Sequence, residues 1–475
     1  MKKINMLLLI NLLMLIAALL IFNLDNFSNI DTKLYKIFYL VINILCFVSI
    51  ISLKNYKLSF LFGLYFISFN IFLNSRVFLD IFGYYEFGKI EMYYSILKNF
   101  DENIIKEIYS CLILSVIFLN FGHILGVSKF FSQKKSSNSS YDPSLYDPSL
   151  YKISVKIFYI FIFISLIGNL VLAQQVFFKG YSSFVSGEIE RVIFFMKAQV
   201  GSIYFFIIVH MSKPPLKKLK RIYYVYIFYI ITFLFIGQRG AFFTNLGLII
   251  FLWNSNIKEI KIKSFIKYIL ILPITAQFFS FYRSYIGKIS LNVFFKNILG
   301  SYITFFYEQG ISVLVIGYAA FYKEELKLNI VNQYFYPFLV SLPFSPFKYQ
   351  SFSIIDNMLS FQHQLSALSK LNEYKYIYNG LGANYIAENY IMGGLILVSL
   401  INFGVGYLSV YLEKIGNKKY GIFLQVICIP YILFLPRGET LQLLSALVNS
   451  GIKFTLILIL LKIILNNKNN ARSLL

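Results

Sequence analysis

The chain has 475 residues and a mean hydropathy of +0.68, and 58% of its residues are hydrophobic while only 14% are charged. Because about a quarter of the residues of soluble proteins are charged, this composition excludes an ordinary soluble domain and indicates an integral membrane protein. The formal net charge of +23 needs its own explanation, which the order of the charges along the chain supplies.

Apolar runs recur along almost the whole chain and predict an all-α polytopic membrane protein with about twelve transmembrane helices. The first run begins after Lys3, and no small-residue cleavage site follows Phe22, so we interpret it as a retained span rather than a signal peptide. The expected spans are residues 4–22, 34–53, 58–73, 105–126, 153–173, 192–211, 222–236, 241–253, 265–281, 386–411, 421–435 and 441–462.

The charges fix the expected orientation of these spans. With both termini inside, the inner segments hold 24 of the 44 basic residues but only four of the 21 acidic ones. Nearly all of the net charge is then on the inner side, as the positive-inside rule requires. Nucleic-acid binding is therefore not needed to explain the charge, and we expect no nucleic-acid partner. Residues 134–151, with two tandem Tyr-Asp-Pro-Ser-Leu copies, are expected to form a flexible inner linker.

We expect three parts: an N-terminal membrane bundle over 1–281, a large helical outer loop over 282–385, and a C-terminal bundle over 386–475. The outer loop is too aromatic for disorder. Apolar residues at steps of three and four from Met358 to Leu371 predict an amphipathic helix in it. The stretch 291–321 is either buried or re-entrant, or forms a membrane hairpin that raises the span count by two.

Arginine is distributed differently from lysine. Five of the seven arginines fall on the expected outer side, at or near span ends. The guanidinium fork binds phosphate with two bonds, whereas the lysine ammonium is a point charge. A cluster that binds an anionic substrate is therefore expected, the alternative being arginines that snorkel to lipid headgroups. The five outer arginines are Arg76, Arg191, Arg239, Arg283 and Arg437.

Arg239 lies in a turn between Gly237 and Gly240, and Arg437 precedes Gly438, so both side chains are expected to project from tight turns. His363 is the only histidine on the expected outer side, and it is either a general base for a sugar hydroxyl or part of a solvated helix face.

The sequence shows no grouping of metal ligands and no phosphate-binding glycine loop. We therefore expect no metal, no cofactor and no nucleotide on the inner side. An activated donor that arrives from the outer side makes both ATP and a sugar nucleotide on the inner side unnecessary.

With these residues in view, the chain resembles the Wzy family of O-antigen and oligosaccharide repeat-unit polymerases. The resemblance covers most of the length: a dozen spans, a late outer loop and a Gln-Arg-Gly turn before it. Its sharpest local match enters the span after the loop and comprises Asn379, Gly380, Gly382, Asn384, Glu388, Tyr390, Gly393 and Gly394.

The resemblance implies a metal-independent glycosyltransferase on the periplasmic face of a bacterial inner membrane, with both termini cytoplasmic. Donor and acceptor would be undecaprenyl-diphosphate-linked oligosaccharides, and a chain-length regulator of the same pathway would be a protein partner. On this hypothesis His363 and Arg283 are catalytic. The residues expected to bind the diphosphate or the sugars are Arg191, Arg239, Arg437, Glu388, Asn384 and Tyr390.

Two other functions stay open at this point. An O-antigen ligase shares the architecture and the donor but transfers to the lipid A core, and it would need an outer-loop histidine such as His363. A flippase or transporter of lipid-linked sugars usually shows internal repeats and charges inside its spans. Neither feature is seen in this sequence, so we favour the polymerase.

Overall fold

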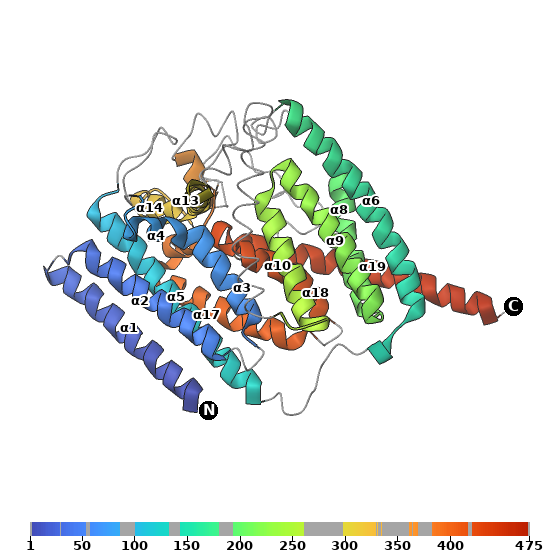
Figure 1. Ribbon diagram of the computed structural model, residues 1–475, viewed down its shortest axis with the longest axis horizontal. Coiled ribbons are helices and arrows are strands. Elements are labelled where there is room, and N and C mark those ends of the chain that lie inside the picture. Colours follow the sequence, from blue (N-terminus) through green and yellow to red (C-terminus); the bar gives the residue numbers. More distant parts are fainter. Residues whose placement is uncertain are drawn as a thin grey trace.

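Helices account for all the regular structure in the described part of the chain (Figure 1). Nine helices within that part are long and apolar enough to cross a membrane. The predicted fold class, an all-α polytopic membrane protein, is confirmed. The computed structural model describes residues 2–28, 30–53, 58–85, 100–132, 143–179, 193–260, 298–328, 330, 334, 361–362, 364–368, 382–416 and 420–473.

The elements follow the predicted spans closely, and only the expected span 265–281 lies outside the described residues. The first half of the chain forms α1 (Lys2–Ser28), α2 (Thr32–Leu53), α3 (Phe60–Phe69), the π-helix η2 (Asn70–Asn74), α4 (Ser75–Ile81), α5 (Glu102–Ser132), the 3-10 helix η4 (Pro143–Leu145), α6 (Pro148–Lys179), α8 (Ile193–Met211), α9 (Leu216–Ile236) and α10 (Arg239–Asn256). The second half forms α13 (Ile298–Gln309), α14 (Ser312–Phe321), α17 (Tyr385–Ile415), α18 (Gly421–Phe434), the 3-10 helix η7 (Leu435–Arg437) and α19 (Thr440–Ser473).

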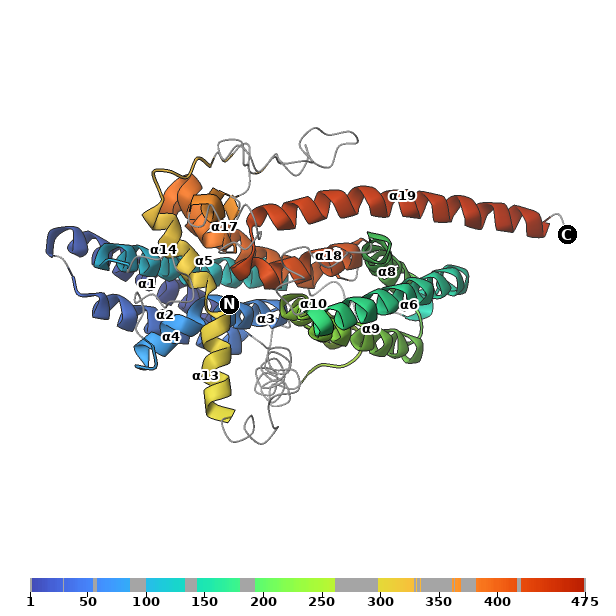
Figure 2. The same ribbon diagram turned by 90° about the horizontal axis from the view of Figure 1, so that it is seen from above.

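The long helices α5 and α17 pack side by side in the first part of the bundle (Figure 2). Two glycines allow their backbones to touch. A Cβ atom on Gly122 would lie 2.1 Å from the carbonyl oxygen of Phe403, and one on Gly406 would lie 2.1 Å from that of Leu119. Small residues at such crossings are typical of membrane helices, because close packing replaces the hydrophobic effect as the source of association.

The apolar side chains on the outside of the bundle are consistent with a lipid environment. Phe163 of α6 and Phe228 of α9 are each 64% exposed, and Ile396 of α17 is 76% exposed. Such residues would be costly in water but are stable against lipid tails, since both are apolar. Among the nine candidate spans, α19 is the most exposed, because only 11% of its apolar segment is buried.

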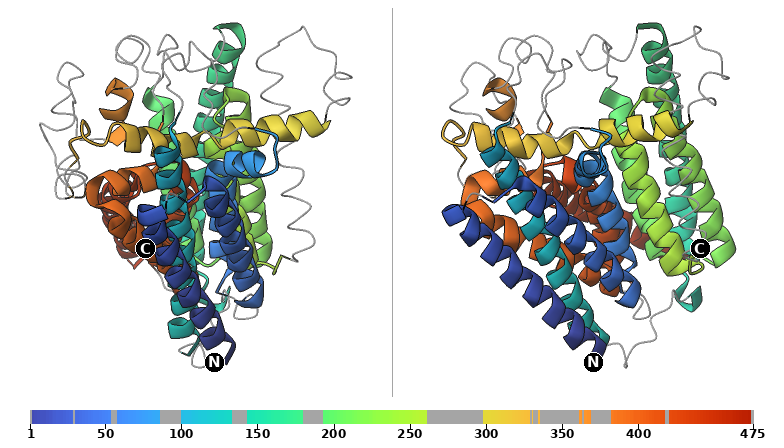
Figure 3. Two further views of the ribbon diagram at one scale, coloured as in Figure 1. Left: turned by 90° about the vertical axis from the view of Figure 1, so that its left-hand side faces the viewer. Right: turned by 60° about the vertical axis from the view of Figure 1, so that its left-hand side comes forward.

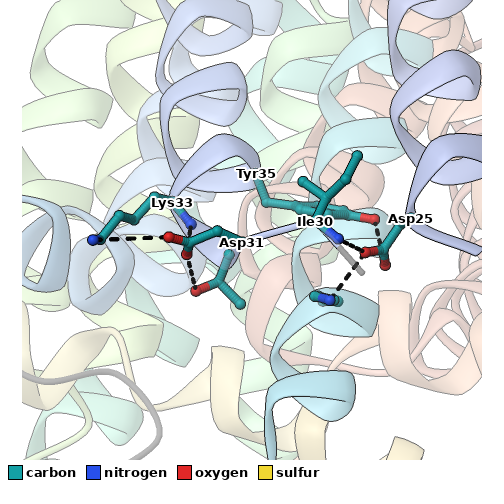
Figure 4. Close-up of polar contacts among 7 residues, drawn as sticks. Asp25, Ile30, Asp31, Lys33 and Tyr35 are labelled. Carbon is teal, nitrogen blue, oxygen red and sulfur yellow. Dashed lines mark hydrogen bonds and ion pairs between the residues drawn. The ribbon is translucent and has the colours of Figure 1, made fainter. Parts of the chain in front are cut away.

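The turn between α1 and α2 is held by two aspartates (Figure 4). Asp25 lies 2.9 Å from the ammonium of Lys106 on α5 and accepts a bond from the hydroxyl of Tyr35. Asp31 accepts the backbone N–H of Lys33 at the start of α2, and this bond lowers the pKa of its carboxyl. The ion pair between Asp25 and Lys106 fastens the first helical pair to α5, and the Asp31 contact caps the start of α2.

α13 and α14 differ from the other helices in direction. They follow one another across the end of the bundle that lies opposite the N-terminus (Figure 3). The two helices do not lie side by side as a membrane hairpin would, although residues 302–321 are apolar enough to be counted among the nine candidate spans. α13 packs on α4 and η2, and α14 packs on α5 and α17.

Candidate anion-binding site at the end of the bundle

Three arginines from three different elements contact three consecutive residues of α13. The Nε of Arg76 on α4 donates to the carbonyl oxygen of Tyr307 at 2.8 Å. Arg239 at the start of α10 forms an ion pair of 3.2 Å with Glu308. Arg437 in η7 donates to the side-chain oxygen of Gln309 at 3.0 Å. We call Arg76, Arg239 and Arg437 the arginine cluster.

The position of Arg239 follows from its turn. Gly237 ends α9 with a φ of 87°, a conformation that favours glycine, and α10 begins two residues later at Arg239. A Cβ atom on Gly240 would lie 2.7 Å from the ring of Phe434, so the start of α10 packs directly against the end of α18. Because α18 leads into η7, this contact places the start of α10, which carries Arg239, near the turn that carries Arg437.

Arg437 projects from the 3-10 turn after α18, where Pro436 occupies the start of the turn. Its guanidinium carbon lies 5.8 Å from the ring centroid of Phe72 in η2, which is within the range of a cation–π contact. The ring and Gln309 hold the side chain from two sides. Arg437 therefore has a defined position at the junction of η7, η2 and α13.

Arg76 is the most buried member of the cluster, with 4% of its surface exposed. The sequence placed it in an outer loop after a span ending at residue 73. The helix instead continues from Phe60 to Ile81, because the π-helical turn of η2 adds residues without breaking it. The guanidinium lies 3.9 Å from the ring centroid of Tyr307 and 5.6 Å from that of Tyr85.

The arginine cluster carries three positive charges, and the three α13 residues that it contacts supply one carboxylate, that of Glu308. The side chain of Arg239 is 18% exposed and that of Glu308 is 37% exposed, so this ion pair is partly open to solvent. An anion with several oxygen atoms fits such an arrangement, because guanidinium groups bind phosphate through paired charge-assisted hydrogen bonds.

Asn384 and Glu388 of the predicted motif are fully buried. The side chain of Asn384 accepts the N–H of Ile386 at the start of α17 and donates to the carbonyl oxygen of Ser312 in α14. Glu388 accepts the N–H of Thr440 at the start of α19, at 2.6 Å. The motif thus joins the ends of α17, α14 and α19, and a carboxylate at the N-terminus of α19 also suits the helix dipole.

Two neighbours extend this junction. Asn389 donates to the hydroxyl of Thr440 and accepts a bond of 2.7 Å from Tyr334. Burial, together with the nearby carboxylate of Glu388, raises the pKa of the Tyr334 phenol, so this residue stays a hydrogen-bond donor. Glu439 is also buried and accepts the N–H of Gln362.

The comparison with known proteins decides the family. The family described as O-antigen polysaccharide polymerase Wzy matches residues 4–470, which is nearly the whole chain. The chain belongs to the Wzy family. No curated protein matches it, and no solved structure matches it. The chain is accordingly a multi-pass membrane protein of a glycosyltransferase-type polymerase family, as the sequence predicted.

The remaining predicted site residues of this Wzy protein are placed as follows. Tyr390 lies on α17 beside Glu107 and Lys323, at the far end of α14 from the arginine cluster. His363, Arg283 and Arg191 lie outside the described residues. The expected amphipathic helix around His363 is described in part, and there Phe361 and Leu365 are buried.

Sequence reasoning missed the α13 side of the site. Glu308 and Gln309 were given no role, and Arg76 was noted only as an outer arginine. A signal was present, because Glu308-Gln309-Gly310 is a polar interruption between two apolar stretches. No group of three or more His, Cys, Asp or Glu side chains that could hold a metal ion occurs in the residues that the structure describes.

Proposed function

We propose that this Wzy protein polymerises oligosaccharide repeat units carried on undecaprenyl diphosphate, at the periplasmic face of a bacterial inner membrane. The observation that supports this most directly is the arginine cluster at the end of the bundle opposite the N-terminus. That end is the outer one if the basic inner segments lie in the cytoplasm. We also propose that both termini are cytoplasmic.

The chemistry that the cluster would support is departure of a diphosphate. A hydroxyl of the acceptor attacks the anomeric carbon of the donor, and the bond from that carbon to the carrier diphosphate breaks. The diphosphate leaves with the electron pair, and its new charge is stabilised by Arg239 and Arg437. Fixed cations can give this stabilisation without a metal, so the proposed reaction is metal-independent.

The acceptor proton needs a base, and His363 is our candidate because an imidazole titrates near neutral pH. Its neighbours are anchored, since Gln362 is bonded to Glu439 and Gln364 forms two bonds with the backbone of Lys327. Arg283 and Arg191 are proposed to complete the contacts with the donor. Asn384 and Glu388 would act by fixing the helix ends around the site.

Glu308 holds Arg239 through one carboxylate oxygen. We propose that the donor diphosphate takes the place of this carboxylate when it binds. The exchange keeps the guanidinium paired in both states, so that Arg239 is neither left without a counter-ion nor forced to move far.

The polysaccharide made by a deletion strain tests the proposed function. A lipopolysaccharide core that carries a single repeat unit, restored to long chains by the wild-type gene, is the expected result. Bare core with polymer left on the lipid carrier would instead indicate a ligase, and loss of periplasmic repeat units would indicate a flippase. A chain-length regulator remains a proposed partner, tested by co-purification from the same membranes.

A further inference from the structure

A second polar cluster lies at the far end of α14 from the arginine cluster. It joins Tyr390 of α17, Glu107 of α5 and Lys323, two residues after α14. The hydroxyl of Tyr390 donates to Glu107 at 2.8 Å and accepts a bond from the Lys323 ammonium at 3.2 Å. The ammonium also lies 4.9 Å from the ring centroid of Tyr390. We call these three residues the tyrosine cluster.

The chemistry of the tyrosine cluster matches that of a sugar ring. A carboxylate offers several acceptor positions and an ammonium three donors, of which the observed bonds use one oxygen of Glu107 and one N–H of Lys323. Glu107 is half-buried and Lys323 is exposed, so the cluster reaches the surface. Sugar hydroxyls both donate and accept hydrogen bonds, so Glu107 and Lys323 suit them, while the buried Tyr390 holds both groups in place.

The distance between the two clusters along α14 limits which ligand could reach both of them. Gln309 contacts the arginine cluster at the end of α13, and Lys323 follows the other end of α14. The ten residues of α14 rise about 15 Å, a length that several linked sugar rings can span. An oligosaccharide whose diphosphate rests on the arginines could therefore reach the tyrosine cluster with a more distant ring.

We propose that Glu107, Tyr390 and Lys323 form a subsite for a sugar of the repeat unit, away from the bond that breaks. The proposal rests on the proposed function and names the part of the substrate that this second site takes. It also gives Tyr390 a role that is separate from the diphosphate. The competing explanation is a structural strut between α5, α17 and the end of α14.

Energetics favour the subsite over the strut. Buried or half-buried polar pairs are often no more stabilising than apolar residues of the same volume. A strut at this position would be equally strong with apolar residues of the same volume in place of all three side chains, whereas recognition of hydroxyls requires both acceptor and donor. The two explanations differ in what a substitution would change. Loss of a subsite would weaken binding of the sugar alone, whereas loss of a strut would weaken binding of every ligand.

The test uses the full-length protein in nanodiscs and two inhibitors of transfer. One is the free repeat-unit oligosaccharide, released by mild acid from the lipid carrier of the host strain. The other is inorganic pyrophosphate. The variants are Glu107→Gln and Tyr390→Phe, both nearly isosteric, with Glu102→Gln in the first turn of α5 as the matched control.

The expected result is that Glu107→Gln weakens inhibition by the oligosaccharide about 3- to 10-fold, because one charge-assisted bond is lost, and that Tyr390→Phe weakens it in the same direction. Inhibition by pyrophosphate is unchanged, and Glu102→Gln behaves as wild type. Equal weakening of both inhibitors, or of neither, would overturn the subsite in favour of the strut.

Failure of the proposed function has a different signature. A wild-type protein that transfers nothing from lipid-linked repeat units contradicts the polymerase. In that event saturation-transfer NMR on the same nanodiscs still measures binding of the free oligosaccharide. Binding that is lost in Glu107→Gln but kept in Glu102→Gln supports the subsite, and absence of binding to the wild type overturns it.

Discussion

At the scale of single residues, the three members of the arginine cluster are held differently. Arg76 is buried between two tyrosine rings and bonded to the backbone. Arg239 and Arg437 are bonded to side chains, which can exchange one partner for another. We therefore propose that Arg239 and Arg437 contact the diphosphate and that Arg76 fixes the position of α13.

Substitution of Arg239 or Arg437 by alanine should lower transfer about 10- to 100-fold. A charge-assisted bond to phosphate contributes roughly 1.5–3 kcal/mol, and each decade of rate corresponds to about 1.4 kcal/mol. Lysine keeps the charge but loses the fork, so Arg→Lys should fall between alanine and wild type. The measurement is polymer length and amount at matched protein levels.

The control for these variants is Arg221→Ala, on the exposed surface of α9, which should polymerise normally. Full activity of both alanine variants would exclude the diphosphate role. Full rescue by lysine would reduce that role to simple charge, as expected of a snorkelling side chain.

Glu308→Gln should strengthen inhibition of transfer by inorganic pyrophosphate. The carboxylate competes with an anion for Arg239, and a partly exposed ion pair of this kind contributes roughly 0.2–1 kcal/mol. The inhibition constant should thus fall about 1.5- to 5-fold, while Glu324→Gln, at an exposed residue after α14, leaves it unchanged. An increase in the inhibition constant would show that Glu308 supports anion binding instead of competing with it.

At the scale of elements, α13 is the part that connects the candidate site. It takes contacts from α4, α10 and η7, which are otherwise far apart in sequence. The turn after it is tightly packed, because a Cβ atom on Gly310 would lie 2.7 Å from the backbone nitrogen of Arg76 and 3.0 Å from the carbonyl oxygen of Phe306. The end of α13 is therefore fixed against α4.

Gly310→Ala should displace α13 and lower transfer about tenfold or more. Overpacking against backbone atoms costs about 1–3 kcal/mol, and the shift would move both Glu308 and Gln309. Gly404→Ala is the matched control, since a Cβ atom at that position of α17 meets nothing within 4 Å. Normal transfer by Gly310→Ala, with the thermal stability of the wild type, would show that the position of α13 does not matter.

At the scale of the whole molecule, one end of the bundle carries the arginine cluster and the opposite end carries the N-terminus (Figure 3). The expected inner segments include the basic run from Lys213 to Arg221, which covers the turn between α8 and α9 and the first turns of α9. This separation of charge is what sets the proposed orientation in the membrane.

Labelling of single cysteines tests that orientation. A membrane-impermeant maleimide should label Tyr84→Cys in intact spheroplasts, because this exposed residue follows α4 at the outer end. Leu145→Cys, exposed in η4, should react only after the inner face is opened. The native Cys46, Cys111 and Cys428 are buried and should give little background. The opposite pattern would place the arginine cluster in the cytoplasm and contradict the proposed function.

The sequence alone determined the fold class and the positions of most spans. Hydropathy is summed over about twenty neighbouring residues, so it needs no knowledge of the fold. Charge bias along the chain gave the expected orientation for the same reason, and the glycines around Arg239 indicated its turn. The motif from Asn379 to Gly394 was also singled out, although the buried helix-end contacts of Asn384 and Glu388 were not predicted.

Only the tertiary structure decided which residues meet. Arg76 and Tyr307 are 231 residues apart, and Arg437 and Gln309 are 128 apart. Such contacts depend on how the helices pack, and hydropathy averaged over neighbouring residues in the sequence gives no information on that packing. The π-helical turn that carries Arg76 into the bundle, and the course of α13 and α14 across its end, are likewise set by packing partners. The partners of the arginines could therefore be read only from the folded chain.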